Sequence, residues 1–79
     1  MNQSLILDTL NKTEGNLDYL KENYNIFKEK YNNKFIAIKD KKIIAVESNI
    51  KKLIKDLKEK GENLSEIVIE FISKIPIIF

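Results

Sequence analysis

The sequence predicts a small α+β domain whose helices pack on one face of a small mixed sheet. Two short apolar runs rich in β-branched residues, Phe35–Ile38 and Ile43–Val46, flank a break at Asp40 and Lys41. Runs of this length are typical of strands and indicate a β-hairpin. Apolar residues at intervals of three and four predict helices before and after the hairpin. A third apolar run, Ile67–Ile72, predicts a closing strand, so the predicted order is helix, helix, strand, strand, helix, strand.

The 79 residues predict one domain, with residues 1–16 as an N-terminal extension and residues 17–79 as its core. Within the extension, residues 4–12 suit a short amphipathic helix behind a Ser4 N-cap. Gly15 and Asn16 predict a break and a new N-cap. The next helix is marked by an apolar stripe and ends at Asn32 and Asn33, because Asn tolerates positive φ. The stripe consists of Leu17, Leu20, Tyr24, Phe27 and Tyr31.

The tip of the hairpin leaves two alternatives open. A two-residue turn of type I′ needs positive φ at both central residues, and Lys41 stands where Gly is most favourable. A turn of three to five residues, or a bulge at Lys41 or Lys42, is an equal alternative.

The helix after the hairpin is predicted from its caps and its apolar spacing. Ser48 and Asn49 offer an N-cap, and Gly61 is placed to end the helix. The apolar positions between them are Ile50, Leu53, Ile54 and Leu57. After the closing strand, residues 75–79 form an apolar tail that fits a short last strand at a sheet edge, because it contains a proline.

A right-handed crossover through this helix predicts the strand order 2-1-3. The first strand is then central and antiparallel to both neighbours, which agrees with its apolar residues on both faces. With the helices on one face, the other face needs the N-terminal segment, the C-terminal tail or a second molecule. This need predicts a homodimer or a complex with another protein.

The composition excludes most catalytic chemistry. The chain has no His and no Cys, so the commonest general base and the usual zinc ligands are absent. The two glycines do not form a phosphate-binding loop. Glu70 is the only acidic residue within an apolar strand, and we expect it to be exposed and paired with a hairpin lysine such as Lys39. We therefore predict a protein that is not an enzyme and has no cofactor and no metal site.

No apolar run approaches the length of about 20 residues that a membrane-spanning helix needs. No secretory signal pattern is present at the N-terminus. We therefore expect a soluble, cytoplasmic protein with no membrane partner.

Several short motifs resemble a family of small archaeal and bacterial proteins that is catalogued as a domain of unknown function. They include Glu22-Asn23-Tyr24, the run from Lys34 to Ile38, Lys60-Gly61 and the closing run from Val68 to Ile72. The family pattern reads ENY, YPGKWVAV, a DGK turn, a helix ending in KG and a V-x-V-E-F-I-P strand. The resemblance spans residues 17–78 and implies a binding or regulatory role. The chain departs from the pattern at two turns, with Asn32-Asn33 for Pro-Gly and Lys41 for Gly.

Two surfaces are candidates for binding. The leading hypothesis is a protein interface formed by an open sheet face or by the C-terminal edge, because large apolar side chains are costly to leave in water. Its residues are Ile75, Ile77, Ile78 and Phe79. The alternative is a nucleic-acid surface, because residues 34–60 hold nine lysines against four acidic residues. Its residues are Lys39, Lys41, Lys42, Lys51, Lys52 and Lys55.

Overall fold

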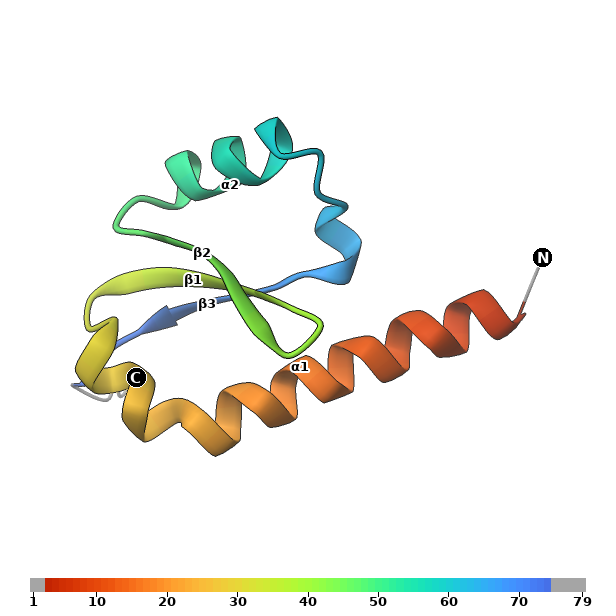
Figure 1. Cartoon of the computed structure of the whole chain (residues 1–79), viewed down its shortest axis with the longest axis horizontal. Coiled ribbons are helices and arrows are strands. Elements are labelled where there is room, and N and C mark those ends of the chain that lie inside the picture. The colour runs from red at the N-terminus through yellow and green to blue at the C-terminus, as the bar shows by residue number, and fades with distance from the viewer. Residues whose placement is uncertain (1–2, 75–79) are drawn as a thin grey trace, which may run out of the picture.

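The computed structural model describes residues 3–74, and its side chains from Lys12 onward. Helix α1 leads into a β-hairpin, a second helix, a short 3₁₀ turn and a third strand (Figure 1). The bounds are α1 Gln3–Lys30, β1 Lys34–Lys39, β2 Lys42–Glu47, α2 Ile50–Glu59, η1 Leu64–Glu66 and β3 Val68–Ile72. The predicted α+β class and the predicted helix that follows the hairpin are both confirmed.

The three strands form one sheet in the order β2-β1-β3, as predicted. Strand β1 is central and pairs antiparallel with both neighbours, so the sheet is antiparallel rather than mixed. Ala37 lies opposite Ala45 on one side and opposite Ile69 on the other. Apolar side chains on both faces of β1 make this central position favourable.

The predicted break at Gly15 and Asn16 is wrong, because both residues lie inside the continuous helix α1. The side chain of Asn16 is only 1% exposed, and its Oδ1 accepts a hydrogen bond from the backbone N–H of Lys41 at 2.8 Å. The two residues that locally favour a break are therefore the ones that meet the hairpin tip. Tertiary contact overrides a weak local preference here.

The helices do not share one face of the sheet, so the prediction that they pack on the same face is wrong. Figure 1 shows α1 and α2 on opposite sides of the three strands. The first core cluster is built on α1 and the second on α2, and β1 contributes to both. The α1 cluster contains Leu20, Phe27, Ile36, Ile38 and Ile72, and the α2 cluster contains Ala37, Leu53 and Leu57.

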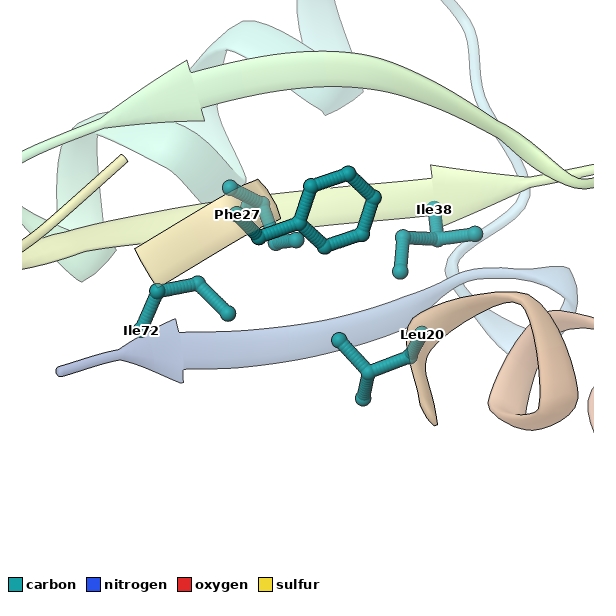
Figure 2. Close-up of a cluster of buried hydrophobic side chains, with 5 residues drawn as sticks. Leu20, Phe27, Ile38 and Ile72 are labelled. Carbon is teal, nitrogen blue, oxygen red and sulfur yellow. The ribbon is translucent and has the colours of Figure 1, made fainter. Parts of the chain in front are cut away.

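The α1 cluster is organised around the ring of Phe27. Figure 2 shows this ring over the sheet, between Ile72 and Ile38, with Leu20 near Ile38. Phe27 is 5% exposed, whereas its neighbour Ile26 is 54% exposed. Because alternate residues of β1 point to opposite faces, each face needs its own helix.

The hairpin adopts the two-residue turn. Asp40 and Lys41 have φ values of 51° and 59°, the positive values that a type I′ turn requires at both central positions. A bulge is also present, but at Ile44 rather than at Lys41 or Lys42. Ala37 pairs with Ala45 and Ile38 pairs with Ile43, so Ile44 has no partner on β1.

The predicted caps of α2 and the predicted end of α1 are confirmed. The side chain of Asn49 caps α2 by accepting hydrogen bonds from Lys51 N and Lys52 N. Gly61, with φ of 75°, ends it, since its N–H bonds to Lys58 O and the next N–H bonds to Leu57 O. After α1, Asn33 takes a positive φ of 63°.

Candidate interaction surface at the sheet edges

The outer edge of β2 is obstructed. The bulge at Ile44 interrupts the regular spacing of the main-chain groups, and Lys60 Nζ donates a hydrogen bond to Ile44 O at 3.2 Å. Near the other end of the strand, Lys52 Nζ lies 3.6 Å from Glu47 Oε2. Bulges and lysines at an edge strand are common means of preventing another strand from pairing with it.

The outer edge of β3 has a different character. Its register with β1 is regular from Val68 to Ile72, and no described strand pairs with its other side. Val68, Ile69 and Phe71 are partly exposed. The ring centroids of Phe71 and Phe35 are 4.9 Å apart, and this cross-strand contact holds β3 against β1. The β3 edge is therefore a regular, mostly apolar strand edge.

Glu70, at the centre of β3, does not pair with Lys39 as expected. Lys39 Nζ instead donates a hydrogen bond to Glu62 Oε2 at 2.8 Å and lies 3.9 Å from Glu66 Oε2. The bond to Glu62 raises the pKa of Lys39 above its ordinary value, although partial burial of the ammonium acts in the opposite direction. Glu70 is partly buried and forms no ion pair with any described lysine. The edge thus carries one carboxylate among apolar residues.

The chain leaves β3 next to the end of α1. Lys74 N donates a hydrogen bond to Asn32 Oδ1 at 3.0 Å, and Lys74 Nζ lies 3.1 Å from Glu29 Oε2. The predicted interface residues follow directly and lie outside the described residues. These are Ile75, Ile77, Ile78 and Phe79.

The lysines of the alternative nucleic-acid hypothesis are spread over the hairpin tip and α2. Lys41 and Lys42 belong to the hairpin tip, whereas Lys51 and Lys52 belong to the first turn of α2, past the far end of β2. A six-residue strand separates the two groups by about 17 Å. In addition, Lys39, Lys52 and Lys55 each have a carboxylate partner among the described residues. Nucleic-acid binding stays a prediction from sequence, and it would be recognised by an affinity that falls steeply with salt.

A hollow of about 200 Å³ lies between α1 and the hairpin tip, lined by Lys12, Gly15, Asp40 and Lys41. Its two ammonium groups and one carboxylate do not form a recognisable catalytic arrangement. Among the side chains that the structure describes, residues 12–74, no group of three or more acidic residues is placed to hold a metal ion. No helix in this part of the chain is long and apolar enough to cross a membrane.

The sequence interpretation missed the residues that distinguish the two edges. The bulge at Ile44 has no marker in a run of four apolar residues. Lys60 stands out in the sequence only as part of the Lys60-Gly61 motif, and its bond to Ile44 depends on how α2 crosses the sheet. An unpaired residue in one strand becomes visible only when the register is known.

Comparison with known proteins identifies a family but no individual relative. No curated protein and no solved structure matches the chain. The profile of a family of unknown function (DUF5678) matches residues 27–74, more than half of the chain. The match begins at the buried Phe27 and covers the whole sheet, α2 and η1, while most of α1 precedes it. The chain therefore belongs to the DUF5678 family of unknown function.

Proposed function

We propose that the protein is a non-catalytic interaction module that forms a homodimer by strand addition at the outer edge of β3. The observation that supports this function is the difference between the two edges of the sheet. Strand β2 is obstructed by the bulge at Ile44 and by Lys60, whereas β3 offers regular main-chain groups. A helix of the same chain lies on each face, so the edge is a better candidate than an open face.

Binding would combine main-chain hydrogen bonds with the burial of apolar surface. Val68, Ile69 and Phe71 are partly exposed on β3 and would become covered by the added strand. The apolar residues 75–79 follow in sequence and would extend the contact. The same edge would also accept a strand from a different small protein, which is the second form of the proposed function.

Glu70 restricts the register of a symmetric pair. Two β3 strands related by a twofold axis at Glu70 would place two carboxylates directly opposite each other, which is unfavourable. An axis at Ile69 places Glu70 opposite Val68 of the partner subunit. An axis at Phe71 places it opposite Ile72 of the partner subunit. We therefore expect one of these two registers.

Light scattering over a range of concentrations tests the assembly. We expect the full chain to be a dimer. A chain that ends at Lys74 should form a weaker dimer, which already dissociates at concentrations at which the full chain is still dimeric. Ile26→Lys is the matched control, because Ile26 is the most exposed large apolar side chain described and belongs to α1 rather than to β3. By light scattering, this variant should have the same molar mass in solution as the wild-type dimer.

Amide hydrogen exchange locates the interface. Dimer formation should slow the exchange of β3 amides in a concentration-dependent way and leave those of β2 unchanged. A chain that is monomeric at every concentration contradicts the homodimer, and slowed exchange at β2 contradicts the assignment of the edge.

A further inference from the structure

Asn16 makes an unusual contact for a residue in the interior of a helix. Its side chain is 1% exposed, and Oδ1 accepts the backbone N–H of Lys41 at 2.8 Å. Its Nδ2 is buried and has no partner among the described residues. Burial of Nδ2 without a hydrogen-bond partner destabilises the folded state. The bond from Lys41 N to Oδ1 is the interaction that offsets this cost.

The hairpin tip needs an external contact. Asp40 and Lys41 both have positive φ, a conformation that is less favourable for residues with a side chain than for glycine. The bond from Lys41 N to Asn16 holds the second of these residues in place. The Lys41 side chain also crosses the helix at Gly15, where a Cβ would lie 3.2 Å from Lys41 Cε. The tip therefore rests on both residues that locally favour a helix break.

The side-chain oxygen of Asn16 has two uses that exclude each other. In a broken helix it would cap the segment that starts at Leu17, with Asn16 in a non-helical conformation. In the structure Asn16 is helical, and the same oxygen accepts the N–H of Lys41. Since Gly15 is a poor helix former, the balance between the two arrangements depends on the hairpin.

We propose that Gly15 and Asn16 form a hinge in α1 that is held straight by the docked hairpin tip. Release of the tip frees the oxygen of Asn16 to cap a helix from Leu17 and uncouples the helical turns before Gly15. Among those turns, Lys12 pairs with Glu66 at 3.8 Å, a partly exposed ion pair of the kind that adds little stability. This hinge does not depend on the proposed dimer.

Native-state amide exchange on the full chain tests the coupling. Replacing Asp40 and Lys41 together by Asn and Gly supplies the preferred type I′ turn. Lys41→Ala is the matched control, because it removes the side chain over Gly15 and leaves the turn preference unchanged. Relative to this control, we expect the Asn-Gly turn to raise the protection of the α1 amides at residues 11–15 by about threefold or more.

The same comparison in an Asn16→Ala background decides the outcome. If Asn16 carries the coupling, the Asn-Gly turn has no effect on those amides in this background. An equal effect with and without Asn16, or no effect in either, overturns the hinge. Circular dichroism establishes that each chain is folded, and Asn16→Leu, which is closer in volume, replaces the alanine variant if that variant does not fold.

Discussion

Replacement of Phe27 by Ala should remove a large part of the stability of the domain. The ring is 5% exposed and packs on Ile38 and Ile72 from the two strands it covers (Figure 2). Its centroid lies 5.7 Å from the ring of Tyr19 and 5.8 Å from that of Tyr31. One side chain therefore joins α1 to the sheet and organises its aromatic neighbours.

The magnitude follows from burial and from these ring contacts. A buried Phe→Ala change costs about 3 to 5 kcal/mol of unfolding free energy. Because Phe27 also loses two tilted ring contacts, we expect its loss to lie near the upper end of that range. A domain of 79 residues has a free energy of unfolding of about 4 to 12 kcal/mol. The Phe27→Ala chain should therefore lose a large share of its stability, and it would be marginally folded if the wild type lies near the lower end of that range. Phe27→Leu fills most of the volume and should lose only about 1.5 kcal/mol.

Urea unfolding followed by circular dichroism measures both losses. Ile26→Ala is the control, because the adjacent side chain is 54% exposed and its removal should change the free energy by no more than about 0.5 kcal/mol. A loss below about 1 kcal/mol for Phe27→Ala would refute the assignment of Phe27 to the core.

Three further predictions concern single contacts. Asn49→Ala removes the cap of α2 and should cost about 1 kcal/mol in urea unfolding, whereas Ser48→Ala should cost much less. Gly61→Ala forces a side chain into φ of 75° and should cost about 1 kcal/mol; an unchanged midpoint would contradict the left-handed cap. Because the pKa of Lys39 is raised in the folded state, its pairing with Glu62 stabilises the domain below pH 10.5, and this is lost as the pH rises through the folded pKa. Thermal unfolding of Lys39→Met should lack this alkaline loss, and equal pH profiles would count against the pair.

Strands and caps were predictable because their signals are local. The runs around Ile36 and Ile44 have the length and composition of strands, and the strand order follows from the handed crossover through α2. Asn49 and Gly61 were recognised because caps depend on a few adjacent residues. These features do not require knowledge of distant contacts.

The errors concern features that depend on distant contacts. Gly15 and Asn16 resemble a helix break in isolation, and only the bond to Lys41 explains why α1 continues. The helices were placed on one face because the apolar residues on both faces of β1 were attributed to another covering element. Glu70 was expected to pair with a hairpin lysine such as Lys39, whereas the loop after α2 brings Glu62 to Lys39 instead. In each case a partner remote in sequence decides the outcome.

The hydrogen bond from Lys60 to the carbonyl of Ile44 bears on how far the sheet can grow. A sheet with two accessible edges can recruit copies on both sides and polymerise into a filament. Among the described strands, only β3 leaves an unobstructed edge, so the proposed association through β3 would end with a closed pair. In this proposed assembly, one lysine at the end of α2 would help to keep the number of associating copies finite.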